Sequence, residues 1–178
     1  MRTANSVIYD LRVTKIVTSL SKKYSVIALG WNRDGISLEK INDYIVKLEL
    51  FKLKTSVWKP SLVRIFTRLI IFFPLFWMWT FIKLLIYRPS VIYACDLDSI
   101  LPCYIYKILF QKRLIFDVFD RYAMASIPTN FRKLYSTINS TEEFFSKHSD
   151  VLIIAGGKKV LETFAEKPKY FTVLLNCP

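Results

Sequence analysis

Short apolar runs alternate with stretches of helical periodicity along the first third of the chain. Residues 11–20 place apolar side chains on one helix face, and a lysine pair follows, where cations suit a helix C-terminus. Residues 25–29 form a continuous apolar run that predicts a short buried strand, closed by Gly30. Residues 44–51 alternate between apolar and polar, which predicts a strand near a sheet edge.

The same rhythm continues after residue 90. The predicted strands cover residues 91–95, 113–119, 151–155 and 171–176, and the predicted helices cover 99–110, 131–147 and a short stretch ending at Ala165. Alternating strands and helices at these spacings predict an α/β fold, a doubly wound parallel sheet of Rossmann type. Ligands of such a sheet bind at the carboxyl ends of its strands. The length fits one domain, so residues 1–178 are predicted to form a single domain.

Residues 62–87 break this pattern because they are dense in aromatic side chains and leucine. Their uncharged core, residues 69–82, is interrupted by Pro74 and is shorter than the roughly 20 apolar residues of a membrane-spanning helix. An interfacial helix or helical hairpin is therefore the favoured interpretation, an internal core helix the second and a span the third. The side chains predicted to contact lipid headgroups are Arg64, Arg68, Trp77, Trp79 and Lys83.

The charge of the chain is strongly positive. Lys and Arg number 26 against 14 Asp and Glu, which gives a formal net charge of +12 and favours polyanionic partners. The basic residues recur as pairs beside apolar runs rather than in one block. This dispersal fits an anionic membrane surface better than a nucleic-acid-binding arm, and no nucleic-acid-binding motif is recognised.

Cysteine usage and the N-terminal residues point to the cytoplasm. Cys95, Cys103 and Cys177 are odd in number and have no C-x-x-C spacing, so neither a disulfide framework nor a zinc site is predicted. The first ten residues are too polar for a signal peptide. The predicted location is cytoplasmic, peripheral on the inner face of the cell membrane.

Asp10 and Arg12 open the first predicted helix. The favoured interpretation is that Asp10 caps this helix and that Arg12 is a surface residue. In the alternative interpretation, Arg12 and the helix N-terminus offer positive charge to a phosphate group.

Asp96 and Asp98 directly follow a predicted strand. Their D-x-D spacing could hold Mg²⁺ or Mn²⁺ beside a diphosphate. The favoured interpretation is a loop at a strand end, in which Asp98 caps the next helix. His148 is the only histidine, so a Ser-His-Asp site or a histidine metal site is not predicted.

Asp117, Asp120 and Arg121 lie at the end of the next predicted strand, before Tyr122. Two carboxylates beside an arginine and a tyrosine could orient sugar hydroxyls. Alternatively, Asp120 and Arg121 form an ordinary surface ion pair, which would contribute little to stability.

Taken in order, the segments resemble the N-terminal domain of the retaining glycosyltransferase family 4, which has the GT-B fold. The matching segments span nearly the whole chain and read DLRVTKIVTSL, YSVIALGWNR, RPSVIYACDLDSILP, KRLIFDVFDRYA, EEFFSKHSDVLIIAGG and VLLNCP. The aromatic segment before RPSVIY is similar to a region through which such enzymes touch membranes. The resemblance implies that Asp10 and Arg12 lie near the diphosphate of the donor. The residues that it places along the acceptor side of the cleft are Asp96, Asp98, Asp117, Asp120 and Arg121.

The chain departs from this family in four respects. The first strand is absent or reduced to residues 1–3, which would leave two interior sheet edges unpaired and the domain marginally stable. Tyr93 stands where many relatives carry His, and Asp120 where many carry Glu. The C-terminal domain, which binds the nucleotide sugar in relatives, is missing, so no catalytic residue is assigned.

The expected function is that of the acceptor-binding half of a retaining glycosyltransferase for polysaccharide biosynthesis, inactive without its donor-binding half. Its acceptor would be a lipid-linked or membrane-presented saccharide, and its other partner an anionic membrane surface. No metal or cofactor is expected, because enzymes of this fold offset the charge of the diphosphate with protein groups. The alternative is a non-catalytic membrane-associated subunit that recruits a separate donor-domain chain.

Overall fold

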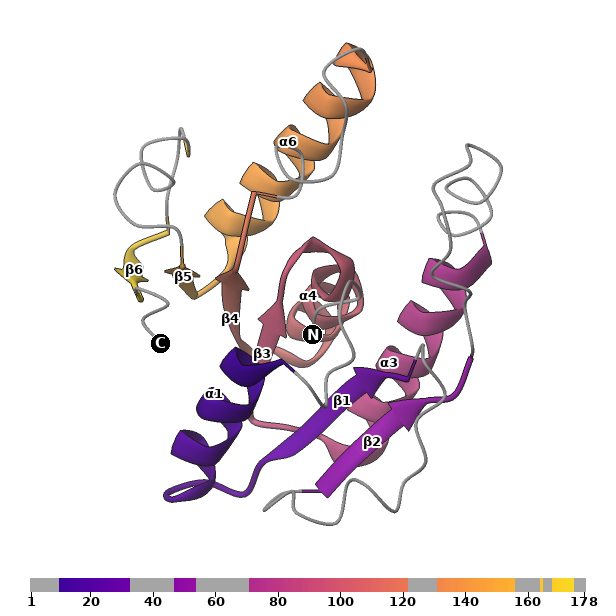
Figure 1. Cartoon of the computed structure of the whole chain (residues 1–178), viewed down its shortest axis with the longest axis vertical. Helices are drawn as coiled ribbons and strands as arrows, with labels where there is room; N and C mark the ends of the chain where they lie inside the picture. Colours follow the sequence, from indigo (N-terminus) through magenta and orange to yellow (C-terminus); the bar gives the residue numbers. More distant parts are fainter. Residues whose placement is uncertain are drawn as a thin grey trace. The chain divides into compact units, whose positions relative to one another are not determined.

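The computed structural model describes residues 10–32, 47–53, 71–121, 131–155, 164 and 168–174. Over these residues the protein is α/β, with four helices and two parallel sheets, which is consistent with a Rossmann-like fold (Figure 1). The chain divides into two compact units, Met1–Thr80 and Phe81–Pro178. The predicted α/β class with parallel strands is confirmed, and the single domain stays a prediction.

The described residues of the first unit form helix α1, the two-stranded sheet and the first half of helix α3. Helix α1 (Leu11–Ser21) buries Val13 and Val17, as its spacing predicts. Strand β1 (Ile27–Trp31) pairs in parallel with β2 (Lys47–Phe51). The prediction that Gly30 closes the first strand is wrong, because the pairing continues to Trp31 opposite Phe51. The buried Trp31 ring holds the strand end in place, and its Nε1 donates to the Leu53 carbonyl at 2.7 Å.

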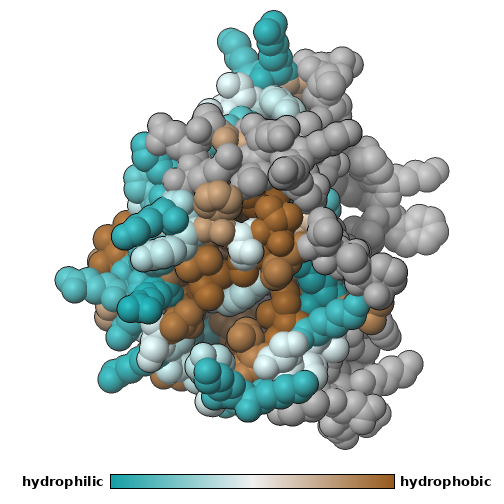
Figure 2. Space-filling view, turned by 90° about the vertical axis from the view of Figure 1, so that its left-hand side faces the viewer, coloured by the Kyte–Doolittle hydropathy of each residue, from teal (hydrophilic) through white to brown (hydrophobic). Residues whose placement is uncertain are grey.

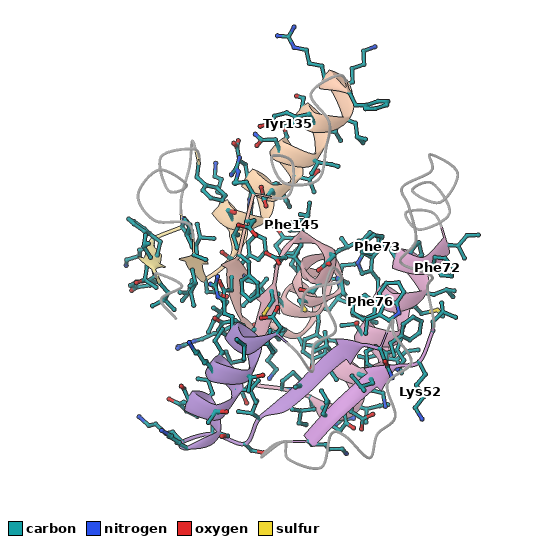
Figure 3. The ribbon with its side chains drawn as sticks, viewed as in Figure 1. Lys52, Phe72, Phe73, Phe76, Tyr135 and Phe145 are labelled. Atoms are coloured by element: carbon teal, nitrogen blue, oxygen red, sulfur yellow. The ribbon has the colours of Figure 1, made fainter. Side chains whose placement is uncertain are left out.

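Helix α3 (Phe73–Tyr87) begins within the aromatic segment, and its first half packs in this unit. Phe72, Phe73 and Phe76 lie side by side along its start (Figure 3). The rings of Phe73 and Phe76 lie 6.3 Å and 5.2 Å from the Trp31 ring. Pro74 does not interrupt the helix, because residues 71–72 before α3 are already π-helical and the helix continues through Pro74 to Tyr87.

The second unit contains the four-stranded parallel sheet, in the order β3-β4-β5-β6. Its strands are β3 (Val91–Cys95), β4 (Arg113–Val118), β5 (Val151–Ile154) and β6 (Tyr170–Val173). Helix α4 (Leu97–Phe110) connects β3 to β4, and helix α6 (Arg132–His148) connects β4 to β5. Both crossovers run in the same direction, so right-handed connections place both helices on one face of the sheet.

The core of the second unit lies between this sheet face and the two helices. Leu114, Phe116 and Val118 of β4 alternate inward and are fully buried. On the helix side, the ring of Tyr104 lies 5.2 Å from the ring of Phe145. β6 is an edge strand of this sheet, and its Tyr170 and Phe171 side chains are about half exposed. Figure 2 views the side of the molecule on which β6 lies, and hydrophobic side chains gather in the middle of that view.

The predicted elements of this unit agree with the structure to within two residues at most ends. The last strand begins at Tyr170, and helix α4 begins at Leu97 rather than near residue 99. Several predictions concern residues outside the described ranges. These are the reduced first strand, residues 44–46 and 62–70, the helix ending at Ala165, and the end of the last strand.

Candidate ligand site at the carboxyl ends of β3 and β4

The ends of β3 and β4 bring two of the predicted site residues together. Cys95 is opposite Asp117 in the sheet register, and Asp96 follows Cys95 directly. The Asp96 N–H donates to the Asp117 carbonyl at 2.8 Å. The two carboxylates therefore arise from adjacent backbone positions at the edge where parallel sheets bind ligands.

Asp96 has an unusual backbone conformation, with φ 59° and ψ 170°. A side chain in this region is strained by roughly 1–3 kcal/mol, and such positions cluster at functional sites. The Asp96 carboxylate accepts the Phe119 N–H at 2.8 Å, which ties the loop after β3 to the loop after β4. Its side chain makes no capping hydrogen bond to α4.

The prediction that Asp98 caps the following helix is wrong, because α4 begins at Leu97. Asp98 lies inside the first turn and is buried. Ser99 helps to hold this turn, since its hydroxyl donates to the Cys95 carbonyl at 2.6 Å. A helix start set by a serine inside the first turn is not visible from cap spacing alone.

Asp117 is fully buried and accepts a hydrogen bond from the Tyr93 hydroxyl at 2.7 Å. Tyr93 is half-buried and lies two residues before Cys95, so both point to the sheet face that carries Asp117. Sequence reasoning did not include Tyr93 among the site residues. Side chains alternate between faces along a strand, so Tyr93 lies on the same face as Cys95, which is opposite Asp117. This alternation could have identified Tyr93.

Asp120 and Arg121, which are adjacent in the sequence, lie in different surroundings. Asp120 is exposed, whereas Arg121 is buried, so the interpretation of a surface ion pair is wrong for Arg121. Arg121 Nε lies 3.1 Å from Glu142 Oε2, and its Nη2 lies 3.2 Å from Glu143 Oε1. Nη2 also donates to Asn139, and the guanidinium stacks 4.0 Å from the centroid of the Phe164 ring. Sequence reasoning missed these partners, although two adjacent glutamates on a helix that covers a sheet were a signal.

Asp10 caps α1, as predicted. Its carboxylate accepts the backbone N–H groups of Arg12 at 3.1 Å and Val13 at 3.4 Å. Both Asp10 and Arg12 belong to the first compact unit. Their position near a phosphate stays a prediction.

The residues predicted to contact a membrane are only partly described. Trp77 and Trp79 are half-buried, and the Trp79 ring lies 5.5 Å from Phe51 and 6.0 Å from Phe76. Lys83 Nζ lies 5.9 Å from the centroid of the Tyr87 ring. Arg64 and Arg68 lie outside the described ranges. Within those ranges, no helix combines the length and the apolar character needed to cross a membrane.

The described residues offer no group of three or more His, Cys, Asp or Glu side chains that could hold a metal ion. Cys95 and Cys103 are buried, and burial raises the pKa of Cys95 from 9.0 to about 11 and that of Cys103 to about 12. Both thiols therefore stay protonated near neutral pH, and a thiolate is the form that acts as nucleophile or metal ligand.

Comparison of the chain with models of protein families, with curated proteins and with solved structures finds no match. The geometry at the ends of β3 and β4 therefore carries the functional argument.

Proposed function

We propose that this chain is the acceptor-binding half of a retaining glycosyltransferase of the GT-B fold. The complete enzyme transfers a sugar from a nucleotide sugar to a lipid-linked or membrane-presented saccharide. The donor-binding half lies on another domain, so this chain alone transfers no sugar. In this proposal the acceptor binds at the carboxyl ends of β3 and β4.

Asp96 and Asp117, whose backbones are joined by the hydrogen bond from the Asp96 N–H to the Asp117 carbonyl, carry the proposal. Carboxylate oxygens accept hydrogen bonds, which suits the hydroxyl donors of a sugar. The hydrogen bonds from Phe119 N–H and Tyr93 hydroxyl hold these two groups before any ligand arrives. A site held in this way loses less conformational freedom on binding. The strained backbone of Asp96 is a further reason to assign function here.

The role of a membrane-associated subunit is the second candidate. It uses the same fold and recruits a separate donor-domain chain instead of a fused domain. The positive charge of +12 supports membrane association in both cases. Two measurements together distinguish this candidate. A subunit of this kind would show sugar-transfer activity when it is mixed with a donor-domain chain, and it would bind no saccharide by itself.

Isothermal titration with a polyprenyl-diphosphate-linked oligosaccharide in detergent micelles tests the proposal. Binding should fall by about tenfold or more in Asp117→Asn and in Tyr93→Phe, since a hydrogen bond to a charged group is worth about 1.5–3 kcal/mol. Glu49→Gln on β2, which removes one carboxylate from the other compact unit, should bind normally. Polyprenyl diphosphate without sugar is the control ligand.

Unchanged binding in both site variants would contradict the proposed acceptor site. A transfer assay with radiolabelled nucleotide sugars separately tests the claim that this chain alone transfers no sugar. Saturable turnover by this chain alone would overturn the claim that it is only the acceptor-binding half.

A further inference from the structure

The amino edge of the four-stranded sheet carries an exposed apolar surface that the proposed function does not use. Helix α3 ends at Tyr87, with three residues between it and β3, and α4 ends at Phe110, with two residues between it and β4. Val91 of β3 is opposite Arg113 of β4. Both helix ends and both strand starts therefore lie at the same edge, opposite the edge with Asp96 and Asp117.

Six apolar side chains at this edge are between 39% and 63% exposed. We call them the amino-edge surface, and its members are Leu85, Ile86, Val91, Ile108, Leu109 and Phe110. The surface has a rigid base, because the Phe110 ring lies 4.6 Å from the ring of the buried Tyr106. These side chains come from two helix ends and a strand start at one edge of the sheet, and a contiguous exposed apolar patch marks an interaction site.

The charges around the amino-edge surface are positive. Arg88 and Arg113 are exposed, and Lys112 is half-buried. The only acidic residues between Phe81 and Arg113 are Asp96 and Asp98, which are buried at the other edge of the sheet.

Among the described residues that directly precede the four strands, Asp150 is the one carboxylate, and its charge is offset. It lies 3.2 Å from Lys107 Nζ and accepts the Leu114 N–H at 2.7 Å. Cations therefore border the apolar side chains. Residues 81–113 contain no exposed carboxylate that would cancel their charge.

We infer that the amino-edge surface docks on an anionic lipid bilayer. The apolar side chains enter the boundary between headgroups and acyl chains, and the cations meet the lipid phosphates. A second copy of this chain fits the surface less well. A twofold interface would place the same patch against itself, and so cation against cation.

This inference rests on the membrane association in the proposed function and names the surface that makes the contact. The aromatic cluster at the start of α3 packs internally against Trp31 and Phe51. The amino-edge surface adds the end of α4, which lies outside the segment predicted from sequence to contact lipid.

Co-sedimentation of the full chain with vesicles tests the inference. The vesicles contain phosphatidylglycerol and phosphatidylcholine in one series and phosphatidylcholine alone in the other. The double variant Ile108→Ser/Leu109→Ser should lower partitioning into anionic vesicles by about tenfold or more, given the transfer free energy of two large apolar side chains. The double variant Arg88→Gln/Arg113→Gln should lower it by roughly fivefold per cation, and only with anionic vesicles.

The matched controls lie on other surfaces. Phe131→Ser/Leu134→Ser removes two similarly exposed apolar side chains from the start of α6, and Lys22→Gln/Lys23→Gln removes two cations after α1. Both controls should bind vesicles as the unaltered chain does, and circular dichroism checks that each variant is folded.

Vesicle binding that is unchanged in both amino-edge variants would overturn the inference. So would a concentration-dependent dimer in sedimentation velocity that Ile108→Ser/Leu109→Ser abolishes, because a second copy would then be the occupant. Saccharide binding in micelles is measured separately. A failure of the vesicle test therefore leaves the proposed acceptor site undecided, and a failure of the saccharide test leaves the docking surface undecided.

Discussion

Asp96 combines a buried carboxylate with a backbone conformation that favours glycine. Its φ of 59° with ψ of 170° is a conformation that brings the Cβ atom close to the backbone, which costs about 1–3 kcal/mol for residues with a side chain. Arg88 and Gln111 also have positive φ, but both lie at the ends of helices, where the left-handed conformation is common. Asp96 instead joins a strand to a helix beside the candidate site.

Replacing Asp96 separates the backbone strain from the hydrogen bond. Both Asp96→Gly and Asp96→Ala lose the bond to Phe119 N–H, but only glycine relieves the strain. We expect Asp96→Ala to be less stable than Asp96→Gly by about 1 kcal/mol in urea unfolding. The exposed Asp120, whose φ is not positive, should show the opposite order or no difference. Equal stability of the two Asp96 variants would show that the conformation is not strained.

The buried thiols of Cys95 and Cys103 predict a pH effect on stability. Their pKa values of about 11 and about 12 in the folded chain lie above the 9.0 of an exposed thiol. Between these values the unfolded chain loses thiol protons that the folded chain keeps, so stability is fully present below pH 9 and falls as pH rises toward 11.

Thiol reactivity tests the burial that raises these two pKa values. In a Cys177→Ser background, both thiols should react with an aromatic disulfide reagent at pH 8 only at the rate at which the chain opens. Urea should accelerate the reaction in step with unfolding. Rapid reaction without denaturant would show that at least one thiol is accessible.

Arg121 connects two elements, the end of β4 and helix α6. Its ion pair with Glu142 is almost fully buried, with side-chain exposures of 2% and 1%. Removing one partner of such a pair leaves an uncompensated buried charge and costs about 3–5 kcal/mol. Arg121 therefore positions the loop that contains Phe119 and Asp120 by anchoring it to α6.

We expect Arg121→Gln to lower the free energy of unfolding by about 3–5 kcal/mol in urea titration. The control is Lys47→Gln, which removes the exposed pair with Glu49 at 3.6 Å and should cost about 0–1 kcal/mol. A double variant, Arg121→Met with Glu142→Gln, should cost less than the sum of the single changes. An Arg121 effect as small as the Lys47 effect would contradict the anchoring role.

Much of the fold could be predicted from local pattern, but the partners of the site residues could not. The run 113–119 identified β4 because, apart from Arg113 and Asp117, it is apolar at every position, as expected of a strand buried on both faces. The capping role of Asp10 followed from spacing alone. Gly30 misled the prediction because its neighbour Trp31 is held by tertiary contacts. Arg121 misled the prediction because its ion-pair partner, Glu142, is 21 residues away in the sequence, on helix α6.

The four-stranded sheet has chemically different edges. Carboxylates gather at the carboxyl ends of its strands, and apolar and basic side chains gather at the amino ends. If both proposals hold, a bound acceptor has to extend along the length of the strands, about 17–20 Å for typical strands of five to six residues. We therefore expect the acceptor to be a saccharide of several rings.

Hydrogen–deuterium exchange with and without a polyprenyl-diphosphate-linked oligosaccharide tests the central claim most directly. The reference state contains the same micelles with polyprenyl diphosphate that carries no sugar. We predict slower amide exchange at residues 95–99 and 117–121, because a bound saccharide covers the carboxyl ends of β3 and β4. Residues 47–53 should exchange at the same rate in both states. Absence of any protection at the two loops, or protection confined to residues 47–53, would contradict the assignment of this edge as the acceptor site.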